Sequence, residues 1–256
     1  MVVHANCSES SGSSLVDYRY SLLVQERLVS LRQDGILGDL LWLLEHPPTI
    51  TLGTSGGSSH LLLPTDDLEV RGVTVVETPR GGDITCHEPG QLVGYPVVDL
   101  AQAPCRRDIH RYLRGLEDGI IGVLAKLGLK GVRIEGRTGV WIAGSPPRKI
   151  AALGVRCNRW ITSHGFALNF ENDLEGFGAI VPCGISDAGV TSLRRELPKG
   201  KVPSSGELRV LVHEEIQASL GVSLGLVVGE EVGELCDSSP AEPKAAGPLS
   251  EPRGLK

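Results

Sequence analysis

One stretch organises the rest of the chain: Arg80-Gly81-Gly82-Asp83-Ile84-Thr85-Cys86-His87-Glu88-Pro89-Gly90-Gln91. It lies between apolar runs at 73–76 and 92–98 that are typical of strands. Its paired glycines allow another chain segment or a ligand to approach the backbone closely. Arg80, Thr85, His87 and Gln91 add a cation and hydrogen-bonding groups beside that gap. Any one of these residues is common in a polar turn, but their density over twelve positions favours a binding loop.

Apolar periodicity predicts the elements around this loop. Apolar residues at helical spacing predict helices over 15–31, 108–127 and 204–220. Short apolar runs bounded by glycine and proline predict strands at 39–45, 49–53, 73–76, 92–98, 139–143, 149–155 and 161–170. Because helices do not alternate regularly with strands, a mixed or largely antiparallel sheet packed with helices is favoured over a doubly wound parallel sheet.

Bulk composition limits the class of protein. The 256 residues suit one large or two small domains, and 41% hydrophobic with 22% charged residues is ordinary for a globular chain. No run reaches the roughly 18 to 20 apolar residues of a membrane helix. The polar, serine-rich segment 1–14 and the Glu/Pro/Ser/Gly-rich tail 229–256 are predicted to be disordered, and 15–220 is the predicted catalytic domain.

Charge is distributed unevenly. The net charge of -6 argues against general nucleic-acid binding. Between Gln102 and Trp160, however, the sequence has twelve Lys or Arg and four Asp or Glu, a local net charge of 12 - 4 = +8. This segment is either a set of ordinary solvated faces or a docking surface for an acidic protein.

The cysteines do not form a metal or disulfide pattern. None stands in a CxxC pair, which favours free thiols in a reducing compartment. The six are Cys7, Cys86, Cys105, Cys157, Cys183 and Cys236. Cys183 has the most suggestive setting, because Pro182 before it and Gly184 after it would hold it at a tight turn where backbone N–H groups could face an oxyanion. The ordinary alternative for a single cysteine is a small buried hydrophobe.

Lys149 is the candidate cation that would activate such a thiol. It begins the small, apolar run Lys149-Ile150-Ala151-Ala152-Leu153-Gly154. Facing inward it would be desolvated and could exchange a proton with a thiol or an incoming amine; facing outward it would be an ordinary strand-edge lysine. Sequence spacing alone does not pair Lys149 with Cys183.

Other polar residues carry weaker signals. His87 and His164 could be metal ligands or bases, but no i, i+4 partner or carboxylate cluster accompanies them, which favours structural or substrate-positioning roles. Cys86 is interpreted as space-filling. The glycine pair forms neither a GxxxxGK[ST] phosphate loop nor GxGxxG, so no nucleotide or other cofactor is predicted.

Several motifs in order resemble the lipoyl(octanoyl) transferase family over about residues 15–220. The first is Arg80-Gly81-Gly82 with Thr85, His87 and Pro89-Gly90-Gln91. The others are Glu45-His46-Pro47-Pro48, Thr138-Gly139-Val140-Trp141, Lys149 to Gly154, Ser163-His164-Gly165 and Val181-Pro182-Cys183-Gly184-Ile185. The resemblance implies a biotin/lipoate protein ligase-like fold, which is a single α/β domain with a mixed sheet.

The resemblance also implies a reaction, the first step of endogenous protein lipoylation. An octanoyl group passes from octanoyl-acyl carrier protein to Cys183 as a thioester, then to a lysine of a lipoyl domain. Lys149 matches the residue that lowers the pKa of the thiol. Implied acceptors are E2 subunits of 2-oxoacid dehydrogenases and the glycine cleavage H protein. The segments implied to line the acyl pocket comprise Arg80, Gly81, Gly82, Asp83, Ile84, Thr85, Cys86, His87, Ala152, Leu153, Gly154, Gly165, Phe166 and Ala167.

Two residues depart from the family pattern. Cys86 stands where the family usually has an aromatic residue, and Glu88 stands where it usually has glycine. Because glycine commonly serves backbone with positive φ, Glu88 is expected to reshape the loop and affect acyl-chain preference. Two alternatives stay open: an ATP-dependent lipoate or biotin ligase, and an inactive acyl-binding protein of the same fold. The expected compartment is the cytoplasm in a bacterium, and the mitochondrion or plastid in a eukaryote.

Overall fold

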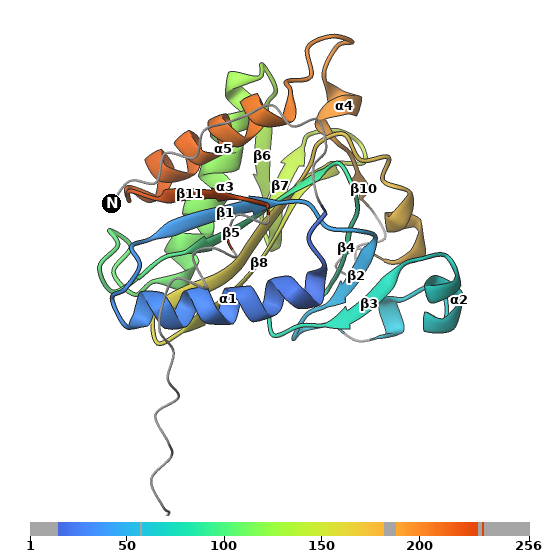
Figure 1. Cartoon of the computed structure of the whole chain (residues 1–256). Coiled ribbons are helices and arrows are strands. Elements are labelled where there is room, and N and C mark those ends of the chain that lie inside the picture. The colour runs from blue at the N-terminus through green and yellow to red at the C-terminus, as the bar shows by residue number, and fades with distance from the viewer. Residues whose placement is uncertain (1–14, 57, 182–187, 230–231, 233–256) are drawn as a thin grey trace, which may run out of the picture.

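The computed structural model describes residues 15–56, 58–181, 188–229 and 232 (Figure 1). Helices and strands follow one another along the chain in a single α/β unit. Their bounds are α1 Tyr18–Gln33, β1 Leu40–Leu44, β2 Thr49–Leu52, η1 Ser58–His60, α2 Thr65–Val70, β3 Thr74–Glu77, β4 Ile84–His87, β5 Gln91–Val97, α3 Ile109–Lys126, β6 Gly131–Ile134, β7 Arg137–Ile142, β8 Arg148–Asn158, β9 Ile161–Asn169, η2 Glu175–Ala179, β10 Gly189–Val190, α4 Leu193–Glu196, α5 Ser205–Leu220 and β11 Gly225–Val228.

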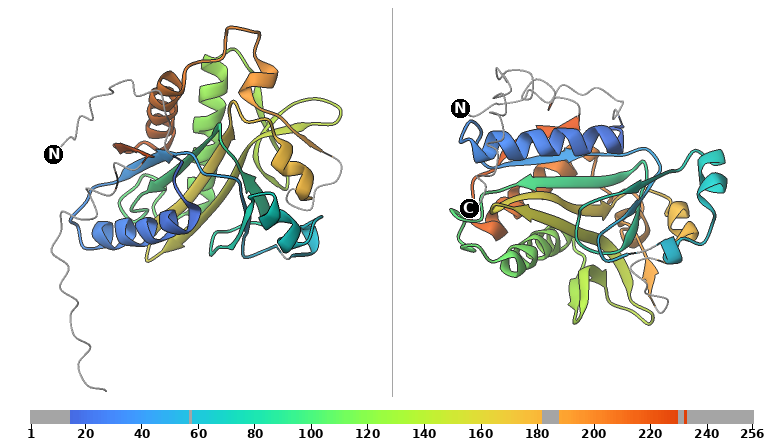
Figure 2. Two further views of the ribbon diagram at one scale, coloured as in Figure 1. Left: turned by 45° about the vertical axis from the view of Figure 1, so that its right-hand side comes forward. Right: turned by 90° about the horizontal axis from the view of Figure 1, so that it is seen from below.

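The main sheet is mixed and largely antiparallel, as predicted. Its strand order is β11-β1-β5-β9-β8-β7-β6, with β10 paired to β8. The pairs β1–β11 and β8–β10 are parallel, and the other neighbours are antiparallel. Helix α1 covers one face, and α3 and α5 cover the other (Figures 1 and 2). Strand β1 reads Leu-Leu-Trp-Leu-Leu and is buried throughout, because both faces of the sheet are covered.

The three longer helices begin with side-chain caps. Asp17 accepts a hydrogen bond from the Tyr20 backbone N–H and starts α1. Asp108 accepts a hydrogen bond from the Arg111 backbone N–H and starts α3. Ser204 and Glu207 form a reciprocal capping box at α5, which ends at Gly221 with a φ of 65°. These helices match the predicted ones, with shifts of one to three residues at several ends.

A second, smaller sheet has the order β3-β2-β4 and packs beside the main one (Figure 1). The sequence predicted β2 and β3, but it treated residues 84–87 as loop. Strand β4 forms because Thr49–Leu52 pairs with it in antiparallel register, from Thr49–His87 to Leu52–Ile84. A run of four residues is too short to show a strand period, so a long-range pairing determines this strand.

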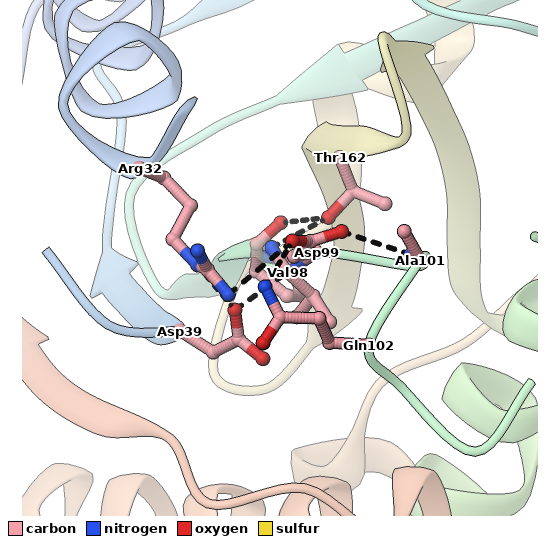
Figure 3. Close-up of polar contacts among 8 residues, drawn as sticks. Arg32, Asp39, Val98, Asp99, Ala101, Gln102 and Thr162 are labelled. Atoms are coloured by element: carbon pink, nitrogen blue, oxygen red, sulfur yellow. Dashed lines mark hydrogen bonds and ion pairs between the residues drawn. The ribbon is translucent and has the colours of Figure 1, made fainter. Parts of the chain in front are cut away.

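A cluster of polar contacts joins α1, β1 and β9 near one end of the main sheet. Figure 3 shows Arg32 reaching Asp39 through Nε at 2.7 Å and Asp99 through Nη2 at 3.6 Å. Thr162 donates to the carbonyl of Pro96 at 2.8 Å and accepts from the backbone N–H of Val98 at 2.9 Å. The contact of Arg32 with Asp99 and both contacts of Thr162 connect segments distant in the sequence, so they fix how the elements meet.

The folded unit extends beyond the predicted domain end at residue 220. Strand β11 adds an edge to the main sheet, and the carbonyl of Gly229 accepts a 2.7 Å hydrogen bond from the Trp42 indole. Val232 is fully buried in the core beneath α1. The predicted disordered segment 1–14, and residues 230–231 and 233–256 of the predicted tail, lie outside the described residues. Among the helices that the structure describes, none is long and apolar enough to cross a bilayer.

Candidate active site

A cavity of about 420 Å³ lies between the main sheet, the small sheet and the start of α1. The residues implied to form an acyl pocket come from three separate segments, and most of them meet here. Those that line the cavity are Arg80, Gly82, Asp83, Ile84, Thr85, His87, Ala152, Leu153, Gly154, Gly165, Phe166 and Ala167. Lys149 lines the same cavity. That an acyl chain occupies it stays a prediction.

The glycine pair brings its loop against β8. The Gly81 N–H donates to the carbonyl of Val155 at 2.9 Å. A Cβ atom on Gly154 would lie 2.6 Å from the Gly81 carbonyl oxygen, so the two segments touch only because residue 154 has no side chain. Gly82 adopts a φ of 92°, which favours glycine. Gly81 itself does not line the cavity; it holds the loop on β8.

Arg80 is fixed by the small sheet. It is buried, and its Nη2 donates to the carbonyl and to the Oγ1 of Thr51, each at 2.8 Å. The guanidinium of Arg80 is therefore a fixed positive charge at the cavity wall, next to the turn at Gly81-Gly82.

Strand alternation separates Cys86 from its neighbours. Thr85 and His87 line the cavity, whereas Cys86 packs in the core of the small sheet with Ile50 and Phe177. Burial, with Glu88 nearby, raises the pKa of the Cys86 thiol and makes it a poor nucleophile. Cys86 therefore does not line the cavity, contrary to the resemblance, and it fills space as its sequence setting suggested.

Glu88 is built into the fold rather than strained. Positive φ values within 80–91 occur at Gly82 and Gly90, not at Glu88. Its buried carboxylate accepts hydrogen bonds from Asn172 Nδ2 at 2.8 Å, from the Leu174 N–H at 2.9 Å and from the Gly176 N–H at 3.1 Å. The side chain thereby ties the loop to the segment that enters η2.

Lys149 faces inward, which decides between the two alternatives for it. It is 6% exposed, and its Nζ lies 4.7 Å from the centroid of the Trp141 ring, a cation–π contact. A Cβ atom on Gly139 would lie 3.3 Å from Lys149 Cε and 2.8 Å from the Ala151 carbonyl oxygen, so the glycine makes room for the lysine stem. Cys183 lies outside the described residues; Val181, two positions earlier, donates its N–H to the His60 carbonyl at 2.9 Å.

Buried aromatic and imidazole rings form one wall of the cavity, which Tyr18, His87, Tyr95 and His164 line and behind which His46 packs. Tyr18 stacks on His87 with centroids 5.4 Å apart, and His46 Nε2 lies 2.7 Å from the Tyr95 hydroxyl. Burial lowers the pKa of His46 to about 4, and burial with nearby Arg side chains lowers that of His164 to about 3. All three imidazoles, including His87 with its lowered pKa, are therefore neutral near pH 7.

Sequence reasoning missed part of this wall. Tyr18 and Tyr95 line the cavity, but in the sequence they read as ordinary core positions of a helix and a strand. Pairing between distant segments turns them toward the cavity, so a single sequence offered no signal for them. Further lining residues without an earlier assignment are Ser55, Val93, Gly136 and Arg137.

Part of the basic segment is neutralised internally. Arg114 Nη1 and Arg133 Nε contact the buried carboxylate of Glu117 at 2.6 and 2.8 Å, and Arg148 Nε contacts Glu196 at 2.9 Å. Glu117 also accepts the Gly139 N–H at 3.0 Å, which ties α3 to the strand beside Lys149. The excess of +8 therefore overstates the charge that this segment offers to a partner.

Comparisons with known proteins identify the family of this chain. Residues 17–216 match the family model of the lipoyl protein ligase A/B catalytic domain. An octanoyltransferase of Chloroflexus aggregans is 50% identical over 194 residues, covering 75% of this chain and 86% of the relative. One of Mycobacterium tuberculosis is 46% identical over 226 residues, covering 88% and 91%.

Solved structures establish the fold. A putative lipoate protein ligase from T. acidophilum with bound lipoic acid superimposes with a TM-score of 0.64 at 16% identity, covering 87% of this chain and 91% of that one. A lipoate-protein ligase A bound with ATP gives 0.62 at 16% identity, covering 87% and 90%. The chain therefore belongs to the lipoyl protein ligase A/B catalytic-domain family and, within it, to the octanoyltransferases, which are acyltransferase enzymes.

Proposed function

We propose that the protein moves an octanoyl group from octanoyl-acyl carrier protein to a lysine of a lipoyl domain, through a thioester on Cys183. The observation that carries this proposal is the buried ammonium of Lys149, held in a cavity whose walls come from the loop at 80–87, β8 and β9. A buried cation at the wall of the cavity suits activation of a thiol, because a nearby positive charge favours thiolate.

The chemistry needs no external energy source. Cys183 thiolate attacks the donor thioester, and the carrier thiol leaves with a proton supplied by Lys149. The amine of the acceptor lysine then attacks the Cys183 thioester to give an amide and restore the thiol. Ala152 and Ala167 add apolar wall to the cavity, and each buried methylene of an acyl tail contributes about 0.8 kcal/mol.

The proposed partners are an acyl carrier protein as donor, with E2 subunits and the glycine cleavage H protein as acceptors. The basic groups that the structure leaves partly exposed around 102–160, such as Arg111 and Arg156, supply a positive surface for acidic donors and acceptors.

Intact-mass measurement after mixing the protein with octanoyl-acyl carrier protein, without ATP, tests the proposal. We expect one octanoyl adduct that hydroxylamine removes and that Cys183→Ala abolishes, with Cys105→Ala as a matched control that keeps it. An adduct that persists in Cys183→Ala would contradict the site. Modification of a lipoyl domain by free octanoate only when ATP is added would instead favour a ligase.

The role of Lys149 has its own test. Lys149→Ala should acylate more slowly at neutral pH and recover part of the rate at higher pH, where the thiol ionises without help. Lys126→Ala, which removes an exposed lysine at the end of α3, is the control. Equal rates for Lys149→Ala and the parent at neutral pH would remove Lys149 from the mechanism.

A further inference from the structure

The ring of His87 is held in one defined orientation at the cavity. Its Nδ1 lies 2.8 Å from Gln91 Oε1, and Tyr18 stacks on its face. The amide of Gln91 has its own direction, because its Nε2 donates to the carbonyl of Cys86 at 3.1 Å and to Asn169 Oδ1 at 2.9 Å. Gln91 therefore turns its oxygen to His87, and His87 Nδ1 must carry the proton.

Two more side-chain amides beyond Gln91 are oriented in the same way. Asn169 Nδ2 donates to the carbonyl of Thr191 at 2.9 Å, so its Oδ1 is the atom that faces Gln91. Asn172 Nδ2 donates to Asn169 Oδ1 at 3.2 Å and to Glu88 Oε1 at 2.8 Å. Each amide is oriented by a group that can only accept, and the series ends at a carboxylate. We call Gln91, Asn169, Asn172 and Glu88 the amide relay.

The other ring nitrogen is left as an acceptor. His87 Nε2 has no hydrogen-bond partner among the residues that the structure describes, and His87 lines the cavity. The titratable and charged groups facing the ring are Tyr18, His46, Arg80 and His164. Burial, with the positive charge of Arg80, lowers the His87 pKa, so the ring stays neutral and Nε2 keeps its lone pair.

The amide relay connects through Thr191 to the backbone of Lys149. Thr191, which accepts from Asn169, donates its own N–H to the carbonyl of Lys149 at 2.9 Å. At the other end of the relay, Glu88 accepts from the Gly176 N–H in η2, the last helical turn before the segment that contains Cys183. Gly154 and Gly165, which are predicted to line the acyl pocket, lie farther along β8 and β9.

We propose that His87, locked by the amide relay as the Nδ1–H tautomer, accepts the proton from the amine of the incoming lysine through Nε2. This inference rests on the proposed function and adds a catalytic residue to its second half. As the amine nitrogen bonds to the thioester carbon, it passes one proton to His87 Nε2. The C–S bond then breaks, and the Cys183 thiolate recovers that proton from His87 or through Lys149. No other reactant is needed.

Two half-reactions distinguish this role from a structural one. His87→Asn places an amide N–H near the former Nδ1 and can still donate to Gln91, but it lacks the acceptor Nε2. In single-turnover measurements by intact mass, we expect transfer from Cys183 to a lipoyl domain to fall about 10²-fold more than thioester formation does. A merely structural defect would slow both halves together, and that result would overturn the inference. If the parent forms no thioester, the proposed function fails instead.

A spectroscopic measurement covers the case in which His87→Asn does not fold. In parent protein labelled with ¹⁵N-histidine, His87 should show a protonated Nδ1 and an unprotonated Nε2 at pH 7. An Nε2–H tautomer or a charged ring would overturn the proposal. Gln91→Glu places a carboxylate beside Nδ1, which favours the charged ring. The pH at which the transfer rate declines on the acidic side of its pH profile should then be higher in Gln91→Glu than in the parent. An unchanged pH profile would equally contradict the inference.

Discussion

The wall formed by Ala152 and Ala167 should set the acyl-chain length. These residues face one another across β8 and β9, and both line the cavity. Ala167→Val adds two carbons to that wall, about the volume of two chain methylenes. An octanoyl tail that can no longer bury two methylenes loses about 1.6 kcal/mol of binding free energy, at about 0.8 kcal/mol each. This loss corresponds to about a 15-fold change in the ratio of the octanoyl rate to the hexanoyl rate. We therefore expect Ala167→Val to lower the rate of thioester formation with octanoyl-acyl carrier protein, relative to the rate with hexanoyl-acyl carrier protein, about 15-fold.

The assay is single-turnover thioester formation with hexanoyl-, octanoyl- and decanoyl-acyl carrier protein, followed by intact mass. Ala151→Val is the matched control, because Ala151 is buried on the neighbouring strand β8 but belongs to the core beneath α3 and α5. Overpacking there should lower the free energy of unfolding by about 1 to 3 kcal/mol and leave the chain-length ratio unchanged. A parent-like ratio in Ala167→Val would refute the assignment of this wall to the acyl tail.

Two further predictions concern stability. Glu117→Gln should lower the free energy of unfolding by about 1.5 to 3 kcal/mol in urea denaturation, because the buried carboxylate loses charged hydrogen bonds while its partly exposed arginines return to water; an unchanged value would contradict this. His46, His87 and His164 bind protons more weakly when folded, since burial lowers their pKa values, to about 4 for His46 and about 3 for His164. The contribution of these neutral histidines to the free energy of unfolding is therefore complete above pH 6.5 and is lost as the pH falls toward 4. Free energies of unfolding that are equal at pH 7 and pH 5 would refute this prediction.

Local signals in the sequence predicted the elements that have a period of their own. The helix around Tyr112 and the helix around Val212 show apolar residues at helical spacing and carry caps, and the structure has both. The strand at 40–44 is apolar throughout because each of its faces meets a covering layer. Strand β4 has no such period, and pairing with Thr49–Leu52 creates it.

The sequence by itself determined which residue types are available for the site: the glycines that allow close approach, a lysine in a small apolar run and polar groups in one loop. Only the tertiary structure decided where these groups point. Lys149 faces inward because Gly139 leaves space for its stem and Trp141 lies beneath its ammonium. Glu88 and Asn172 meet across 84 positions, and strand pairing far from either residue brings them together. A side chain's direction depends on partners that one chain segment does not specify, so residue type can be read locally and orientation cannot.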